Sequence, residues 1–155
     1  MDGPEVIEDR APKSLVKFAW AAAAVALVGL GDAVYLTAKH FTDEKLPCSL
    51  ITGCEQVLTS EYAEIFGIPT AAFGALAYFL AFSLALLAAF GNRKMWLFYG
   101  LLTVVMFLFT VWLVYLQAFV IEAFCQFCLL SALTTTLLFI IALISKFWKY
   151  WSSEQ

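Results

Sequence analysis

The sequence predicts an all-α integral membrane protein in which four transmembrane helices form a bundle. Two observations predict this fold class. The chain of 155 residues is 63% hydrophobic and only 14% charged, whereas a soluble domain has about 45–50% apolar and about 25% charged residues and could not bury so much apolar surface at this size. The apolar residues are also gathered into four long runs, at about 15–37, 70–90, 95–119 and 125–148.

Each run has a length that fits a membrane span. A helix of about 20 residues crosses the hydrocarbon core, and lipid offers no partners for backbone groups outside a helix. Aromatic residues near the ends of the runs, among them Trp20 and Trp148, are typical of the membrane interface. We therefore expect one membrane domain over residues 15–148, with a cytoplasmic segment before it (1–14) and a cytoplasmic tail after it (149–155).

Basic residues indicate how the four spans are oriented. Seven of the nine lie before the first span, between the second and third, or at the end of the fourth: Arg10, Lys13, Lys17, Arg93, Lys94, Lys146 and Lys149. Because cytoplasmic loops carry most Lys and Arg, we expect a multi-pass protein of the cell (inner, cytoplasmic) membrane with both termini in the cytoplasm and the loops 38–69 and 118–124 facing outward. The basic residues are few and scattered, so nucleic acid is not an expected partner.

Residues 59–66 in the first outer loop have the pattern of a short amphipathic helix. Tyr62 and Phe66 would face the bilayer, with Glu61 and Glu64 on the outer side. Such a helix would cap the bundle and keep water out of a pocket between the spans. An ordinary surface helix is the alternative.

All four cysteines fall on the outward side of this predicted topology. Cys48 and Cys54 lie in the first outer loop, and Cys125 and Cys128 begin the fourth span as Cys-Gln-Phe-Cys. A helix N-terminus favours the thiolate, which is the species that attacks a disulfide or an oxidant. This pair also lies at membrane depth, within reach of a lipid-soluble electron acceptor. The loop pair can meet a soluble partner outside and carry its redox state to the helix pair.

Other interpretations of the cysteines stay open. The outward side is oxidising, so two structural disulfides are one alternative, although a disulfide within Cys-x-x-Cys closes too short a loop to stabilise much. Four thiolates can also bind zinc, but Cys48 and Cys54 are spaced more widely than usual zinc ligands, and no metal site is expected. Isolated cysteines can be small hydrophobes. A non-catalytic membrane scaffold or transporter, stapled by disulfides, is therefore the alternative class of function.

Several motifs together resemble the vitamin K epoxide reductase family, in the form found in bacteria and archaea. They are Tyr-Leu-Thr at 35–37, Cys48 with Cys54, Val-Leu-Thr-Ser at 57–60, Phe-Gly-Ile-Pro at 66–69, Phe-Gly at 73–74 and Cys-Gln-Phe-Cys at 125–128. The resemblance covers about residues 29–140. It implies a four-helix bundle around a quinone (menaquinone, ubiquinone or related), closed on the outward side by the first loop.

The resemblance also implies a function and a role for each cysteine. The protein would be a quinone-dependent thiol–disulfide oxidoreductase that supports disulfide-bond formation. Cys48 would exchange with an extracytoplasmic thioredoxin-like or DsbA-like protein, Cys54 would exchange with Cys125, and Cys128 would lie next to the quinone ring. Many bacterial members carry a fused thioredoxin-like domain, whereas this chain ends at Gln155, so a separate partner protein is expected.

The remaining expected site residues are quinone contacts. The resemblance places Ser60 on the short helix that caps the pocket, and Phe127 lies between the two helix cysteines, where its ring could stack on the quinone. Human-type members have a Tyr and an Asn where this chain has Ala132 and Thr70. These departures argue against vitamin K epoxide as the natural substrate and for a plain quinone. A reductase that runs toward quinone or vitamin K epoxide is the alternative within the same chemistry.

Two polar residues in the outer part of the first span are candidates for proton transfer. An acidic group such as Asp32 is costly within a span and marks a functional site, but the preferred interpretation is a residue near the interface that reaches water or a partner. His40, the only histidine, is expected to be an interfacial residue rather than a proton carrier.

Overall fold

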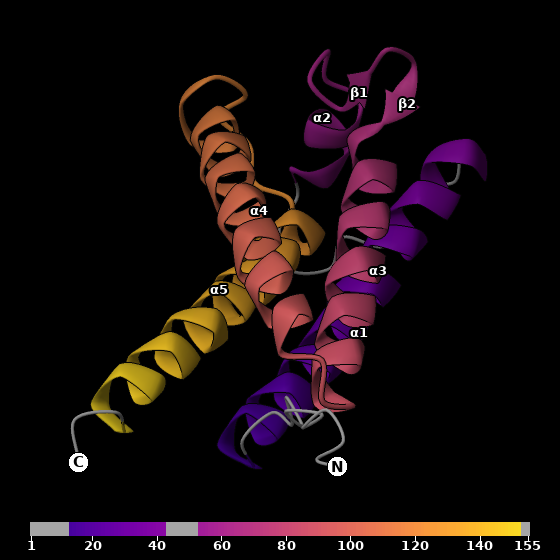
Figure 1. Ribbon diagram of the computed structural model, residues 1–155. Helices are drawn as coiled ribbons and strands as arrows, with labels where there is room; N and C mark the ends of the chain where they lie inside the picture. The colour runs from indigo at the N-terminus through magenta and orange to yellow at the C-terminus, as the bar shows by residue number, and fades with distance from the viewer. Residues whose placement is uncertain (1–12, 43–52, 153–155) are drawn as a thin grey trace, which may run out of the picture.

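Four long helices form the body of the molecule (Figure 1). The computed structural model describes residues 13–42 and 53–152, the last six by their backbone alone. The long helices are α1 (Lys13–Thr42), α3 (Thr70–Ala89), α4 (Arg93–Phe119) and α5 (Gln126–Ser152). Within the described ranges, these four helices are long and apolar enough to cross a membrane. Each predicted span is therefore helical, and the predicted fold class is confirmed.

The outer faces of the helices carry many large apolar side chains that are exposed. Leu97, Leu101 and Leu108 of α4 are each more than 60% exposed. Exposed apolar side chains in such number cannot be stable in water, and a lipid bilayer solvates them. The fold is therefore a bundle whose interior is protein and whose exterior is lipid.

Small residues allow α1 and α3 to pack closely. Ala22 and Ala26 of α1 and Ala81 of α3 are completely buried, and small residues of this kind let helix backbones approach each other in membranes. At Gly29 of α1, a Cβ atom would lie 2.6 Å from Cζ of the Tyr78 ring on α3. No side chain fits there, so Gly29 determines how closely Tyr78 approaches α1.

The two ends of the bundle differ in composition. The start of α1, the α3–α4 turn and the end of α5 lie together at one end (Figure 1). Gly91 in that turn has a φ of 109°, which favours glycine, and the Asn92 N–H donates to the carbonyl of Leu87 over 3.2 Å. Arg93 and Lys94 follow directly, so basic residues gather at this end, and the cysteine-bearing segments lie towards the other.

A compact cap between α1 and α3 occupies the opposite end of the bundle (Figure 1). It consists of α2 (Cys54–Leu58) and a hairpin of β1 (Glu64–Ile65) and β2 (Ile68–Pro69), in which Ile65 pairs with Ile68. The predicted short helix exists, but its predicted position at residues 59–66 is wrong. The Ser60 hydroxyl donates to the carbonyl of Val57 over 2.7 Å as α2 ends, and Phe66 and Gly67 both have positive φ, as a two-residue hairpin turn requires.

Candidate functional site

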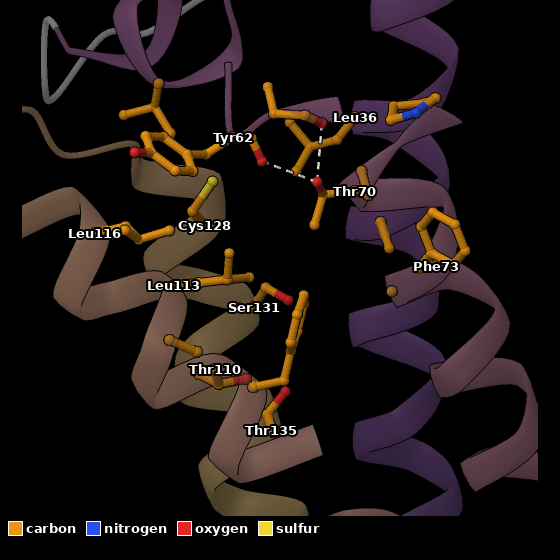
Figure 2. Close-up of a pocket in the computed structure, with 18 of the residues that line it drawn as sticks. Leu36, Tyr62, Thr70, Phe73, Thr110, Leu113, Leu116, Cys128, Ser131 and Thr135 are labelled. Carbon is orange, nitrogen blue, oxygen red and sulfur yellow. Dashed lines mark hydrogen bonds between the residues drawn. The ribbon is translucent and has the colours of Figure 1, made fainter. Parts of the chain in front are cut away.

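A cavity of about 400 Å³ lies between the helices, beneath the cap. All four long helices and the cap contribute to its lining, and most of the lining side chains are apolar, including Leu36, Phe73 and Met106. Figure 2 shows Cys128, Ser131 and Thr135 along one wall. A pocket of this size and polarity is typical of small-molecule binding sites.

Cys125 and Cys128 stand at the start of α5. Cys125 directly precedes the helix, and its carbonyl accepts a hydrogen bond from the Leu129 N–H over 3.0 Å. Its own N–H donates to Oε1 of Gln117 on α4 over 3.3 Å. Both cysteines are free thiols, with Cys125 completely buried and Cys128 partly exposed to the cavity. The dithiol therefore has one buried sulfur and one that reaches the cavity.

The thiolate form of this dithiol is favoured on Cys125. The hydrogen bond from the Cys128 thiol is the largest effect, and with the backbone N–H groups of Phe127 and Cys128 it lowers the pKa of Cys125 from 9.0 to about 7, against the opposing effects of burial and of the charge on Asp32. A thiol with this pKa is about half ionised at neutral pH. Cys125 is thus a sulfur of the pair that ionises readily.

Cys54 lies beside this dithiol. It is disulfide-bonded and completely buried at the start of α2, in one cluster with Val57, Ala123 and Cys125. A disulfide-bonded sulfur and a free thiol in one buried cluster are the reactants of thiol–disulfide exchange. Cys48, the remaining predicted site cysteine, lies outside the described residues.

Gly53 is the residue that lets the two cysteine-bearing segments meet. A Cβ atom at this position would lie 2.8 Å from the carbonyl oxygen of Phe124 and 3.0 Å from its nitrogen. Since backbone atoms cannot move aside as a flexible side chain can, only glycine fits between α2 and the segment before α5. The sequence by itself suggests only that Gly53 makes the loop mobile, because the contact joins residues about 70 positions apart.

The predicted quinone contacts divide into two groups. Ser60, Thr70 and Ala132 line the cavity. Phe127 does not, because a residue one position before Cys128 on a helix points about 100° away from it. Its ring packs instead against Tyr35 of α1, with 5.5 Å between the ring centroids. The prediction that Phe127 stacks in the pocket is therefore not supported by its position, which is at the α1–α5 interface.

The hydroxyl of Thr70 ties α3 to the cap. It lies 2.9 Å from the carbonyl oxygen of Ala63 and 3.1 Å from that of Tyr62, as drawn in Figure 2. Because a hydroxyl has a single proton, Thr70 has no donor left for a ligand. The same holds for Ser60, whose proton is used on Val57.

A buried polar network forms the floor of the cavity. The Tyr78 hydroxyl lies 2.9 Å from the hydroxyl of Ser131, 2.8 Å from that of Thr134 and 2.7 Å from that of Thr135. Tyr78 is only 1% exposed, so this network joins α3 to α5 within the bundle. In the sequence, this network is visible only as a tyrosine inside the second span and several hydroxyl residues close together inside the fourth. Neither pattern shows that these residues meet, because they belong to different helices.

Asp32 and His40 occupy different surroundings. Asp32 is more enclosed than a residue at the interface would be: it is 8% exposed, and its Oδ2 is the one enclosed side-chain oxygen or nitrogen without a hydrogen-bond partner in the described part of the chain. The turn of α1 that follows it packs against α5 through Tyr35, which brings its charge near Cys125. His40 lines the cavity, and its Nε2 lies 2.9 Å from Oε1 of Glu64, joining α1 to β1.

The comparison with known families agrees with this geometry. The model of the vitamin K epoxide reductase family matches residues 20–143, a range that contains all four cysteines, the cap and most of each long helix. This family consists of helical membrane oxidoreductases whose chemistry links disulfides and quinones. The chain is therefore a membrane oxidoreductase that belongs to the vitamin K epoxide reductase family.

Proposed function

We propose that the protein oxidises an extracytoplasmic thioredoxin-like or DsbA-like protein and passes the electrons, through its two cysteine pairs, to a quinone in the cavity. One observation carries this proposal. The dithiol at the start of α5 has Cys125 in a buried cluster with Cys54 and has Cys128 in the lining of the cavity. A single pair of sulfurs thus adjoins both a protein disulfide and an apolar pocket.

The first half of the proposed reaction is disulfide exchange with the partner protein. A thiolate of the partner attacks Cys48 in a Cys48–Cys54 disulfide, and the mixed disulfide is resolved by the second thiol of the partner. The partner leaves oxidised, and Cys48 and Cys54 become a dithiol. Two electrons and two protons have then entered the loop pair.

The second half moves the electrons inward. The Cys54 thiolate attacks Cys125 in an oxidised helix pair, and Cys48 then resolves the Cys54–Cys125 bond, which leaves Cys125 and Cys128 as thiols. Their return to a disulfide releases two electrons and two protons, the number that converts a quinone to a quinol. The bound quinone supplies the oxidant, and the chain supplies placement, exclusion of water and the low pKa of Cys125.

The lining of the cavity supports a plain quinone as the electron acceptor. Ala132 stands where human-type members have a tyrosine, and Thr70 has its proton engaged by the cap. Positions 132 and 70 therefore do not offer the polar donors that would hold an epoxide. The apolar walls and the volume of about 400 Å³ suit a quinone ring and part of its tail.

The distribution of charge supports the proposed orientation. Lys13, Lys17, Arg93, Lys94 and Lys146 lie at the end of the bundle opposite the cap. The positive-inside rule assigns such an end to the cytoplasm. The cap and the cysteines would then face the outside, where an oxidising environment and soluble partner proteins are found.

The function is tested with purified protein in lipid, a decyl-substituted benzoquinone as acceptor, and two electron donors: a reduced thioredoxin-like protein and dithiothreitol. We expect Cys128→Ser to abolish quinone reduction with both donors. Cys48→Ser should abolish it with the protein donor and retain it with dithiothreitol, which can reduce the helix pair directly. Turnover by Cys128→Ser at the wild-type rate would refute the proposed electron path.

A further inference from the structure

Gln117 connects the cavity to the reactive dithiol. It lies near the end of α4, is 4% exposed and lines the cavity. Its side chain lies 3.3 Å from the backbone nitrogen of Cys125. Because a backbone N–H can only donate, the amide must turn its oxygen toward Cys125. This contact fixes the orientation of the whole amide group, and with it the position of the NH₂ group.

The NH₂ group of Gln117 has donors that nothing in the described chain accepts. The hydrogen bond to Cys125 is the one interaction of this side chain among the described residues. Among the described residues, one side-chain nitrogen or oxygen is both enclosed and without a partner, and it is Oδ2 of Asp32. The Gln117 amide nitrogen has no partner there either, so it is not enclosed. Gln117 lines the cavity and is otherwise buried, so the cavity is the open space available to this amide nitrogen.

Two other hydroxyl groups of the lining near the cap, those of Ser60 and Thr70, are already engaged. The hydroxyl protons of Ser60 and Thr70 are used on backbone carbonyls, and the Tyr78 hydroxyl is surrounded by oxygen atoms of α5. An unpaired amide donor in apolar surroundings costs free energy until it finds an acceptor. The cavity thus has a spare donor at the end where the dithiol lies.

We propose that Gln117 donates a hydrogen bond to a carbonyl oxygen of the quinone while its own oxygen holds Cys125 in place. This inference rests on the proposed function, since it names the contact that orients the electron acceptor beside Cys128. The residue acts as a donor and does not transfer a proton: both protons released when the dithiol becomes a disulfide go to the quinol.

The proposed contact has a physical consequence for the rate. Negative charge grows on the quinone oxygens as electrons arrive, and a fixed N–H donor stabilises that charge more than it stabilises the neutral ring. The same amide holds the backbone of Cys125, so the acceptor and the thiolate are positioned by one rigid group. Removing the donor should therefore lower kcat as well as raise KM for the quinone.

Two substitutions separate the two halves of the amide. Gln117→Met has a similar volume and removes both the donor and the acceptor. Gln117→Glu keeps an oxygen for the Cys125 N–H and replaces the NH₂ group by an oxygen, which donates only when the carboxyl is protonated. Thr103→Val is the control, because Thr103 is a buried polar residue of α4 that bonds within its own helix and lies outside the cavity lining.

Quinone reduction is measured with dithiothreitol as donor and the decyl-substituted benzoquinone as acceptor, and compared with oxidation of the same dithiol by cystamine, a small disulfide. We expect Gln117→Met to lose about tenfold or more in kcat/KM for the quinone, with a smaller loss toward cystamine. Thr103→Val should match the wild type with both oxidants. Equal losses toward both oxidants would indicate a merely structural role and would overturn the inference.

The pH profile of Gln117→Glu gives a second readout. The titratable groups around this position are Cys125 just before α5, Cys128 of α5, Asp32 of α1, and His40 of α1 with Glu64 of β1 beneath the cap. All of them are present in both proteins, so two ratios of variant to wild-type rate are followed: one for quinone reduction and one for alkylation of Cys125. As the pH rises, the new carboxyl loses its proton and can no longer donate to the quinone. We therefore expect the ratio for quinone reduction to fall with rising pH, and to fall more than the ratio for alkylation.

The outcomes distinguish this inference from the proposed function. If the wild type reduces the quinone and Gln117→Met does so with unchanged kcat and KM, the hydrogen bond to the quinone is refuted and the electron path stands. If the wild type itself cannot pass electrons from dithiothreitol to the quinone, the proposed function fails and the inference fails with it.

Discussion

The floor and the mouth of the cavity use polar groups in opposite ways. At the floor, the hydroxyls of Tyr78, Ser131, Thr134 and Thr135 satisfy one another within 2.9 Å. At the mouth, which is the end of the cavity beneath the cap, the Gln117 amide has donors that no described residue accepts, and Cys125 and Cys128 are free thiols. A fully paired buried network makes a structure rigid, whereas unpaired groups are available for chemistry. The paired hydroxyls at the floor therefore hold α3 to α5, and the groups at the mouth take part in the reaction.

The largest expected effect concerns the mouth and depends on Gly53. In Gly53→Val the side chain would collide with the backbone of Phe124 and push Cys54 away from Cys125. We expect the rate of electron transfer from the protein donor to fall by about a hundredfold or more, because disulfide exchange needs sulfur-to-sulfur contact. Turnover with dithiothreitol, which bypasses the loop pair, should change much less.

The matched control for this change is Gly100→Val on α4, where an added Cβ meets no atom within 4 Å. It should behave as the wild type with both donors. Wild-type turnover of Gly53→Val with the protein donor would show that Cys54 and Cys125 do not need the close contact of their two segments.

The next effect concerns the floor. Tyr78→Phe removes the hydroxyl that joins α3 to α5 and leaves its oxygen partners in an apolar interior. We expect the free energy of unfolding to fall by about 1–2 kcal/mol, in line with hydrogen bonds between membrane helices and with buried groups that lose a partner. The measurement is unfolding in mixed micelles, with quinone reduction followed at a temperature where both proteins are folded.

Tyr115→Phe is the control for the floor, since Tyr115 is 56% exposed on α4. It should leave the unfolding free energy unchanged. If Tyr78→Phe lost quinone reduction while its stability stayed normal, the floor would belong to the reactive part of the cavity, and the contrast between the two regions would be wrong.

The pH dependence of Cys125 tests the mouth directly. Its pKa is lowered to about 7, so the thiolate fraction falls as the pH drops through 7 and levels off above it. In the reduced wild-type protein, where the Cys128 thiol is present, we expect alkylation of Cys125 by iodoacetamide to be about tenfold faster at pH 8 than at pH 6. Mass spectrometry of the labelled peptide gives the rate, and a rate that still rises steeply from pH 8 to pH 9 would contradict the low pKa.

The smallest expected effect comes from Asp32. Its charge opposes ionisation of Cys125, so Asp32→Asn should lower the pKa of Cys125 further and speed alkylation at pH 6 by a few-fold. Above pH 8, where the thiol is already ionised, the variant and the wild type should react alike. A shift of the profile toward higher pH would show that Asp32 supports the thiolate instead of opposing it.

Local patterns in the sequence predict much of the fold and part of the site. The four helices occupy the predicted spans because a long apolar run in lipid has no alternative to an α-helix. Cys125 and Cys128 are recognisable from their spacing, and the cap was expected between the first two spans. The hairpin at Glu64–Pro69 was not, since Phe66 takes a left-handed conformation that a helical pattern of apolar residues does not reveal.

The sequence by itself determined that this chain is a membrane bundle with sulfur chemistry at one end, because hydrophobicity and motif spacing are properties of neighbouring residues. Only the tertiary structure decided which of those residues meet. It turned Phe127 toward Tyr35, enclosed Asp32, wedged Gly53 against Phe124 and brought Gln117 to Cys125. Contacts of this kind depend on how helices far apart in the chain pack against each other, and no local pattern encodes that packing.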